Sequence, residues 1–534
     1  MKHLRAALHR FLSVFRRGSW ERDMSQELES HLAMHIEDNL RAGMSPEEAR
    51  RAAIMRLGGI APTQESYRDR KGLPLLDNLL RDLRYAFRTL RRTPGFTLAA
   101  IITLALGIGA NTAVFSVVHG VLLRPLPYPA PDRLVTIHDG MTPADEPGWP
   151  ACVADFLVWR NRAHSFQQLA AFAPNGYTLT GEGDAEALRG AVVTAQFFDI
   201  LGARPLIGRT FAADEDQPGH TATVLLGEAL WERKYRRDPR VLGKTIVLNG
   251  RPAMVIGVMP ASFHFIYREA DIWRVFTLDP PTRRGPFFLR GLARLKPGVT
   301  LQQASAELDA LGREVEAADP RKAEHVRYTA MRVLDDMVLG VRPLLHVISG
   351  AVTLVLLIAI FNVANLMLAR AGAREREMAI RLSIGAGRRQ LARQLLTESI
   401  VLALAGGMAG VLLAEIGVRV LRTVAPPGLP RLEDIAVDTT VLAFTAIVSI
   451  ASGVVFGLAP MIGAPLAALS TALKEGGPGS VDSPRSRRLR AALVVVEVSP
   501  SVVLLAGAGL LIRSFDLLGR VPFGFDAPPD RLLT

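Results

Sequence analysis

Residues 345–368 read LHVISGAVTLVLLIAIFNVANLML, and residues 374–394 read REREMAIRLSIGAGRRQLARQ. The first stretch is apolar and long enough to cross a bilayer as a helix, which takes about 20 residues. The second carries six arginines and two glutamates, and a further apolar run follows it. A basic segment between two apolar runs is typical of a cytoplasmic loop, but its charge also fits binding to nucleic acid, anionic lipid or a protein partner. The rest of the chain decides between these alternatives.

The composition indicates a protein that is partly in a membrane and partly in water. The chain has 534 residues, of which 49% are hydrophobic, and its mean hydropathy is +0.22. That mean is high for a soluble protein and low for one that lies wholly in the bilayer. The net charge of +12 fits either nucleic acid or a membrane surface, so the placement of the charges matters. The single cysteine, Cys152, excludes an intrachain disulfide and a zinc site built on cysteines.

Five stretches of the sequence are long and apolar enough to be membrane spans. They are residues 97–119, 345–368, 396–420, 441–465 and 491–512. Lysine and arginine gather before the first span, between the second and third, and between the fourth and fifth, which places these segments in the cytoplasm. The cytoplasmic connections are then residues 369–395 and 466–490, and the exported parts are residues 120–344, 421–440 and 513–534. The basic segment is explained by this topology, so nucleic acid is not an expected partner.

Two parts of the chain are predicted to fold outside the bilayer. Residues 1–80 have the pattern of a small helical cytoplasmic region. Residues 120–344 alternate strand and helix patterns, with a hairpin around Asn249-Gly250 and a helix that begins after Thr300. We therefore expect a membrane protein with about five helical spans, a small helical cytoplasmic part and a large exported α+β domain.

No residue pattern indicates an enzyme or a metal site. The stretch LGKT at 242–245 ends like a phosphate-binding loop, but Asp238 occupies the position that its first glycine needs. The sequence has no motif of a serine hydrolase, a zinc protease or a cysteine nucleophile. The adjacent carboxylates of residues 214–216 are interpreted as a solvated loop. We expect no catalytic residue, no bound cofactor and no metal on this chain.

Polar residues inside the spans are candidates for functional or packing roles. Glu497 lies in the fifth span, where a carboxylate is costly unless it is paired or near the interface, so it either has a function or faces the bundle or the headgroups. Asn362 and Asn365 lie near the cytoplasmic end of the second span, where we expect hydrogen bonds between helices. Gly406 and Gly410 form a G-x-x-x-G pattern that allows close helix packing, within the chain or in a dimer.

The order of these parts resembles a known family of membrane proteins. One span, a large exported domain and three further spans, with EMAIRLSIGAGRRQLARQLLTES at 377–399, resemble the FtsX-like permeases and specifically the MacB type of ABC transporter permease. GAVVTAQFFDILGARPLIGRTF at 190–211 and VLGKTIVLNGRPAMVIGVMP at 241–260 resemble the periplasmic core domain of that type. The fifth span resembles the start of a second unit, as in the duplicated permeases described from acidobacteria. The chain is accordingly interpreted as a truncated or fragmentary member.

The resemblance implies a function and partners. Such permeases carry ATP-driven motion from a cytoplasmic ABC ATPase to the periplasmic domain, for export or for work in the periplasm. This sequence has no nucleotide-binding motif, so ATP is expected on a separate ATPase subunit. Further expected partners are a second permease unit, from a homodimer or an internal duplication, a periplasmic adaptor and membrane lipid. The expected place is the bacterial inner membrane, as a multi-pass protein with a cytoplasmic N-terminus.

The resemblance also assigns residues to the contact with the ATPase. The coupling helix of the family matches EMAIRLSIGA at 377–386. The residues expected to dock the ATPase are Glu377, Met378, Ile380, Arg381, Leu382 and Gly385. The alternative role for this segment is a positively charged loop that only touches anionic lipid. The alternative functions of the chain are a membrane interaction or sensory protein of the same fold that is not coupled to ATP hydrolysis, and a secondary transporter.

Overall fold

A computed structural model gives the fold of the chain. It describes residues 30, 32–56, 74–139, 148–265, 270–279, 281, 284–318, 326–373, 380, 388–425, 431–463 and 484–520. The chain divides into two compact units, which we call the helical unit and the sheet unit. The helical unit comprises Met1–Val114, Gly350–Arg419 and Val437–Thr534, and the sheet unit comprises Phe115–Ser349 and Val420–Ala436.

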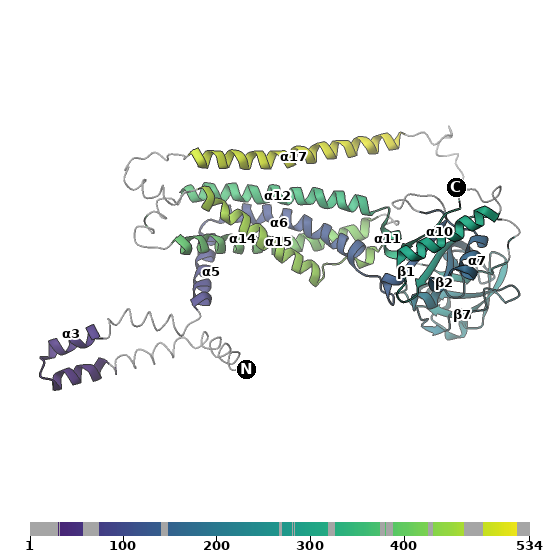
Figure 1. Cartoon of the computed structure of the whole chain (residues 1–534), viewed down its shortest axis with the longest axis horizontal. Helices are drawn as coiled ribbons and strands as arrows, with labels where there is room; N and C mark the ends of the chain where they lie inside the picture. The colour runs from purple at the N-terminus through teal and green to yellow at the C-terminus, as the bar shows by residue number, and fades with distance from the viewer. Residues whose placement is uncertain are drawn as a thin grey trace. The chain divides into compact units, whose positions relative to one another are not determined.

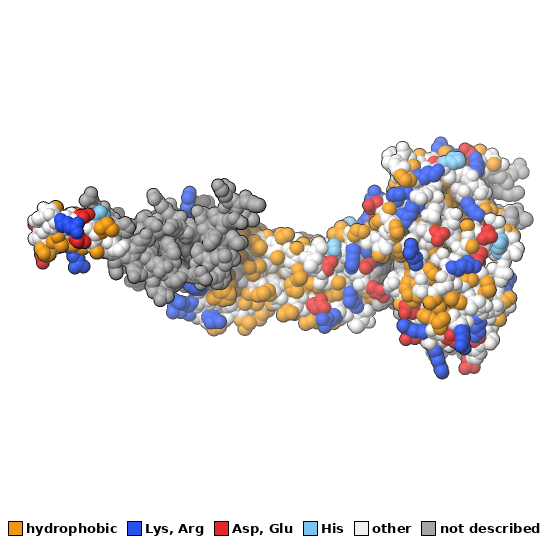
Figure 2. Space-filling view, turned by 90° about the horizontal axis from the view of Figure 1, so that it is seen from below, with side chains coloured by type: hydrophobic (Ala, Val, Ile, Leu, Met, Phe, Trp, Pro, Cys, Tyr) orange, Lys and Arg blue, Asp and Glu red, His pale blue; other side chains and the backbone are white. Residues whose placement is uncertain are grey.

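The helical unit is a bundle of long apolar helices that lie side by side (Figure 1). Its long helices are α6 (Pro94–Val118), α12 (Arg342–Ala373), α14 (Arg388–Val424), α15 (Thr439–Gly463) and α17 (Pro484–Gly519). The described residues contain five helical segments long and apolar enough to cross a membrane, which confirms the expected number of spans. These helices extend beyond several of the predicted spans because hydropathy marks only the part in hydrocarbon, whereas the backbone hydrogen bonds continue into polar flanks. Hydrophobic side chains cover much of the exposed face of the bundle, as Figure 2 shows.

Shorter helices precede the bundle. α3 (Pro46–Arg56) belongs to the predicted N-terminal helical region. α5 (Pro74–Arg92) ends one residue before α6, and it runs transverse to the long helices, near one end of the bundle, rather than along them (Figure 1). Thr93 stands between α5 and α6, and Pro94 begins α6 because proline fits the first turn of a helix, where no backbone N–H is needed.

The sheet unit is built on one mixed sheet of 10 strands, which confirms the predicted α+β class. The strand order is β10-β1-β9-β2-β3-β8-β5-β7-β4, and β6 pairs with β2 and β7. The strands are β1 (Leu134–Asp139), β2 (Phe166–Thr180), β3 (Glu186–Val193), β4 (Ile207–Gly208), β5 (Thr223–Gly227), β6 (Thr245–Leu248), β7 (Arg251–Met259), β8 (Ile272–Val275), β9 (Arg290–Leu295) and β10 (Tyr328–Arg332). Its helices are α7 (Val153–Arg162), α8 (Phe197–Leu201), α9 (Glu228–Tyr235), α10 (Leu301–Ala318) and α11 (Val333–Val338). The pairs β3–β8 and β5–β7 are parallel, and the other pairs are antiparallel.

Local sequence signals in the sheet unit are confirmed. Asn249 and Gly250 join β6 to β7 with positive φ angles of 49° and 74°, as a tight hairpin turn requires. Before α10, the Gln303 backbone N–H donates to Thr300 Oγ1 at 3.2 Å, and the Thr300 N–H donates to Gln303 Oε1 at 2.9 Å. This reciprocal pair is the predicted capping box, and it fixes where the helix begins.

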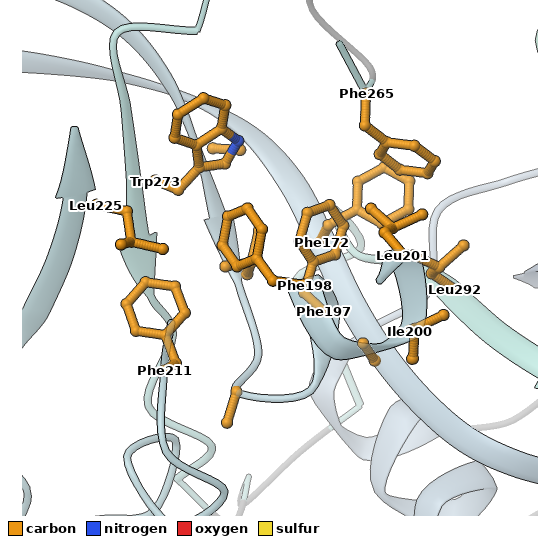
Figure 3. Packing of buried hydrophobic residues seen from close by; sticks show 14 of the residues in the cluster. Phe172, Phe197, Phe198, Ile200, Leu201, Phe211, Leu225, Phe265, Trp273 and Leu292 are labelled. Carbon is orange, nitrogen blue, oxygen red and sulfur yellow. The ribbon is translucent and has the colours of Figure 1, made fainter. Parts of the chain in front are cut away.

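An aromatic core joins α8 to the sheet (Figure 3). Phe197 and Phe198 in α8 have ring centroids 5.2 Å apart with perpendicular planes, and Phe197 packs in the same way on Phe265 at 5.4 Å. Phe198 also packs edge-on against Trp273 in β8 at 6.0 Å. Edge-to-face pairs of this kind add about 0.5–1.5 kcal/mol each to the area they bury. The short helix α8 is therefore held by two adjacent phenylalanines rather than by its own length.

The acidic loop at 214–216 corrects an expectation. Glu215 and Asp216 are buried, with 8% and 3% of their surface exposed, so the loop is not simply solvated. Asp216 accepts a hydrogen bond from Arg160 in α7 at 3.2 Å, and Glu215 accepts one from Arg209 at 2.6 Å. The carboxylates are buried because each has a guanidinium partner, which sequence spacing does not reveal.

Candidate functional site

The helices of the bundle approach one another through glycine. A Cβ atom at Gly109 in α6 would lie 2.9 Å from the Gly410 carbonyl oxygen in α14. A Cβ at Gly406, one turn earlier in α14, would lie 2.6 Å from Leu104 Cβ. The structure thus places both glycines of the G-x-x-x-G pattern against α6 of the same chain. Side chains larger than hydrogen would separate α6 from α14.

Buried polar side chains connect the same helices. Asn111 in α6 donates from Nδ2 to the Val352 carbonyl oxygen in α12 at 2.6 Å. The hydroxyl oxygens of Thr112 in α6 and Thr445 in α15 are 3.0 Å apart and hydrogen-bonded. Asn111, Thr112 and Thr445 were not predicted from the sequence, although a stripe of small polar residues along an apolar helix is a recognisable signal for hydrogen bonds between spans.

Two arginines hold α5 and the start of α6 where α12 ends and α14 begins. Arg370, near the end of α12, pairs with Glu398 in α14 at 3.0 Å and donates to Thr93 Oγ1 at 2.9 Å. Arg393, near the start of α14, donates from Nε to Asp82 Oδ2 in α5 at 2.7 Å. Both arginines flank the predicted coupling segment, and neither was singled out from the sequence. The bonds join helix ends that are far apart along the chain.

The predicted coupling residues are only partly within the described residues. Ile380 is helical there, and 47% of its surface is exposed. The other five expected docking residues lie outside the described part of the chain: Glu377, Met378, Arg381, Leu382 and Gly385. The ATPase-docking role of this segment therefore stays a prediction.

The structure brings two other candidate residues together. Asn365 in α12 donates from Nδ2 to Glu497 Oε2 in α17 at 3.3 Å. Asn362 lies half-buried one turn earlier on α12. Glu497 is half-buried, whereas most of the apolar side chains of α17 are exposed. This hydrogen bond gives the carboxylate a partner inside the bundle, which lowers the cost of placing it in an apolar helix.

Residues 119–125, which follow α6, are hydrogen-bonded to residues 431–435. We call these two segments the collar. Arg431 donates to the carbonyl oxygens of Arg124 at 2.6 Å and Pro125 at 3.3 Å, and it pairs with Asp434 at 2.8 Å. Only 4% of the Arg431 side chain is exposed. A Cβ at Gly120 would lie 2.7 Å from the Asp434 carbonyl oxygen, so the two segments are in direct backbone contact.

The collar also contacts other residues of the sheet unit. The Tyr128 hydroxyl donates to the His264 carbonyl oxygen at 2.8 Å, and His264 Nε2 lies 2.9 Å from Glu433 Oε2. Burial raises the pKa of the Tyr128 hydroxyl above its ordinary value, so the hydroxyl keeps the proton that it donates. The loop at 421–440 was predicted only as a short connection, and the structure shows that its residues 431–435 bind residues 119–125.

A buried histidine–aspartate contact joins β1 to α11. His138 at the end of β1 lies 3.2 Å from Asp336 in α11, and α11 precedes α12. Burial by itself would raise the pKa of Asp336, but the hydrogen bond and charge of His138 outweigh it and hold this pKa below its ordinary value. Arg342 at the start of α12 pairs with Asp335 at 2.5 Å. The first strand of the sheet, β1, is therefore bound to α11, the helix that precedes α12.

The described residues contain no group of three or more histidine, cysteine, aspartate or glutamate side chains able to hold a metal ion. The single cysteine, Cys152, is buried at the start of α7, where its thiol donates to Asp155 at 3.0 Å. Burial raises the pKa of the Cys152 thiol, which disfavours the reactive thiolate. This cysteine therefore has the surroundings of a structural residue.

Comparisons with known proteins identify two domain types. A model of the MacB-like periplasmic core domain matches residues 97–311, and a model of the FtsX-like permease C-terminal domain matches residues 349–475. The ABC transporter permease YvrN of Bacillus subtilis is 27% identical over 284 residues, which cover 51% of this chain and 66% of YvrN. The macrolide export ATP-binding/permease protein MacB of Neisseria meningitidis is 27% identical over 251 residues, or 44% of this chain and 37% of MacB.

Solved structures of similar domains were also found. The periplasmic region of MacB from Actinobacillus actinomycetemcomitans is 16% identical, with a TM-score of 0.31, over 42% of this chain and 95% of that one. The extracellular domain of the transporter YknZ from Gram-positive bacteria is 13% identical, with a TM-score of 0.26, over 37% of this chain and 99% of that one. The chain spans 66% of YvrN and 37% of this MacB. It contains a MacB-like periplasmic core domain followed by an FtsX-like permease C-terminal domain, and it is similar in this order to membrane permeases of the MacB/FtsX type.

Proposed function

We propose that the chain transmits ATP-driven motion from a separate cytoplasmic ABC ATPase to its periplasmic sheet unit. The observation that carries this proposal is the continuity of three helices. α6, α12 and α14 each contain residues of both units, so each is a covalent connection between the bundle and the sheet unit. A displacement applied to the cytoplasmic ends of these helices has three parallel paths into the sheet unit.

Contacts at the helix ends support this role. Arg370 and Arg393 brace α12 and α14 on either side of the coupling segment. In the sheet unit, Arg431 and the His138–Asp336 pair bind together the segments that follow α6 and precede α12. We therefore expect that when one of these helices moves, the helices bonded to it move with it. Transmission of this kind needs contacts that differ between two states of the ATPase.

The coupling segment between α12 and α14 is the proposed docking site. In the sequence, Met378 and Leu382 are four positions apart, which is the spacing of neighbours on one face of a helix. Ile380, at 47% exposure, is available for contact on the same segment. The proposed orientation puts this segment and the N-terminus in the cytoplasm of a bacterial cell and the sheet unit in the periplasm. ATP binds the separate subunit in this proposal.

A second permease unit completes the proposed assembly. α17 resembles a first span, and its apolar side chains are largely exposed, so it fits the start of a second unit or a contact with one. The Asn365–Glu497 hydrogen bond would then fix α17 on the bundle. A periplasmic adaptor that binds the sheet unit is a further proposed partner.

The experiment is ATPase stimulation by the full chain in nanodiscs. ABC ATPase subunits encoded in the same genome are added, and ATP hydrolysis is measured with and without the permease. The proposal predicts stimulation by the native chain and none by a Met378→Glu/Leu382→Glu variant. Met55→Glu is the matched control, because Met55 is 71% exposed on α3 in the N-terminal region. Stimulation that survives the double substitution would exclude this docking site, and a chain that binds and stimulates no ATPase would favour an uncoupled sensory protein.

A further inference from the structure

α5 has three chemically different faces. With 3.6 residues per turn, its residues divide into a face toward the bundle, an exposed apolar face and an exposed basic face. The buried residues are Asp82, Ala86, Thr89 and Leu90. Leu80 and Phe87 form the exposed apolar face, at 39% and 57% exposure, whereas Leu79, at 44% exposure, lies about 100° away from Leu80, in the direction of the buried face. The exposed basic residues are Arg81, Arg84, Arg88, Arg91 and Arg92.

The basic face is narrow. At 100° per residue, its five arginines lie within an arc of about 100°, beside the apolar face that contains Phe87. A helix that exposes an apolar stripe and an adjacent cationic stripe is typical of a helix that lies in the membrane interface. Leucine and phenylalanine side chains exposed together on one side are not expected for a helix that lies in water without a partner.

The placement of α5 agrees with this interpretation. α5 runs transverse to the long helices near one end of the bundle (Figure 1), and these helices are long and apolar enough to cross a membrane. A helix that is transverse to the spans near their end runs along the bilayer surface rather than through it. Thr93, directly after α5, is held by Arg370 at 2.9 Å, so the turn from α5 into α6 has a fixed position on the bundle.

We propose that α5 is an interfacial helix whose arginine face binds the phosphate groups of anionic phospholipids. Leu80 and Phe87 enter the boundary of the acyl chains, and the arginines stay at the depth of the headgroups. Guanidinium groups bind phosphate oxygens in bidentate geometry, which suits a row of arginines on one face. Five cations against anionic headgroups give the charge complementarity of this surface. The apolar stripe favours a lipid surface over a nucleic acid or an acidic protein, because neither of these would bury it.

The lipid contact has a consequence at the coupling segment. Asp82 on the buried face of α5 accepts a hydrogen bond from Arg393 at 2.7 Å, and Arg393 follows the coupling segment on α14. Arg370 precedes that segment and binds the Thr89–Thr93 turn. When α5 is bound to lipid, the helix ends on either side of the coupling segment are therefore held in place through Arg370 and Arg393. Lipid binding by α5 stands independently, whereas this consequence rests on the proposed function.

The test measures lipid selectivity of the full chain in nanodiscs. The discs contain phosphatidylcholine with a minor fraction of phosphatidylglycerol, and one of the two lipids carries a spin label. Electron spin resonance then gives the fraction of each lipid that the protein immobilises. The native chain is expected to prefer phosphatidylglycerol, and Arg81→Gln/Arg84→Gln/Arg88→Gln is expected to lower that preference by about fivefold or more, since each arginine at an anionic surface contributes severalfold.

A matched control removes the same charge elsewhere. Arg41, Arg50 and Arg51 are exposed in the N-terminal region, and their replacement by glutamine is expected to leave the preference unchanged. Replacement of Arg81, Arg84 and Arg88 by lysine is expected to keep most of the preference, which shows that folding is intact. Unchanged lipid preference in the glutamine variant, or an equal loss in the control, would overturn the proposal. ATPase stimulation by the native chain is measured in the same discs. If the native chain prefers phosphatidylglycerol but stimulates no ATPase, the result counts against the proposed function and leaves the α5 inference standing.

Discussion

Arg393 in α14 and Asp82 in α5 form an ion pair with an Nε–Oδ2 distance of 2.7 Å, although 311 positions separate them in sequence. The aspartate is 11% exposed and the arginine 40%. The pair joins α5 to α14, the helix that follows the coupling segment. It therefore ties together two elements that the proposed function requires to move as one.

The Arg393–Asp82 pair is expected to stabilise the bundle modestly. Arg393→Ala should lower the free energy of unfolding by about 1 kcal/mol, because solvent screens the half-exposed arginine while Asp82 loses its partner. The measurement is the thermal unfolding of the full chain in detergent. Arg419→Ala, which removes a 75% exposed arginine from the same helix, should have a smaller effect. Exchanging the charges, as Asp82→Arg/Arg393→Asp, should restore part of the loss; no recovery would mean that the ion pair is not the cause.

The contact between Gly109 and Gly410 is expected to tolerate no side chain. Gly410→Ala places a methyl group 2.9 Å from the Gly109 backbone nitrogen, so the helices must separate at a cost of about 1–3 kcal/mol. Reduced thermal stability of the purified chain is the measured result. Gly507→Ala in α17 is the matched control, because no atom lies within 4 Å of the added methyl. If both substitutions have the same effect, the α6–α14 contact is not the reason for the glycine.

Arg431 is expected to keep the two segments of the collar, residues 119–125 and 431–435, in contact. Arg431→Ala leaves the carbonyl groups of Arg124 and Pro125 without their donor, which should destabilise the collar by about 1–3 kcal/mol. Arg431→Lys should recover little, because one ammonium cannot reproduce the planar fork of the guanidinium. Hydrogen–deuterium exchange of residues 119–125 is the measurement, and faster exchange is expected. Arg520→Ala, at a 73% exposed arginine, should leave that exchange unchanged, and protection retained in Arg431→Ala would contradict this role of Arg431.

The His138–Asp336 pair is expected to make stability depend on acid pH. The pKa of Asp336 is lowered in the folded protein from an ordinary value of 3.8, so its contribution is present above that value. It is lost as the pH falls below 3.8 through the lower folded pKa, where protonation removes the charge that His138 binds. Unfolding midpoints measured over this range should fall less steeply in Asp336→Asn. Parallel pH profiles for both proteins would show that Asp336 does not carry this dependence.

Much of the architecture follows from the sequence because its signals are local. The apolar runs that became α6, α12, α14, α15 and α17 are visible without any partner, since hydrophobicity over one helix length suffices. The β6–β7 turn was predictable because Asn249 and Gly250 adopt positive φ angles at low cost. The α10 cap was predictable because Thr300 and Gln303 bond to each other's backbone.

The contacts that build the candidate site were not predictable in this way. Arg431 is one arginine in a short loop, and nothing nearby in sequence indicates that it binds carbonyl groups about 300 positions away. Glu215 looked solvated because its partner Thr223 Oγ1 and the guanidinium of Arg209 meet it only after folding. Glu497 and Asn365 were both candidates, but no spacing rule could pair residues of different spans. Long-range polar pairs are specified by the packed fold rather than by any local pattern.

The central claim is that ATP-driven motion travels from the coupling segment to the sheet unit. It is tested most directly by hydrogen–deuterium exchange at collar residues 119–125, in nanodiscs with the full chain and its ATPase, comparing samples without nucleotide and with ATP and vanadate. The account predicts a nucleotide-dependent change in exchange at the collar, which Met378→Glu/Leu382→Glu abolishes and Met55→Glu does not. Identical collar exchange in both nucleotide states, with the ATPase bound and hydrolysing ATP, would contradict it.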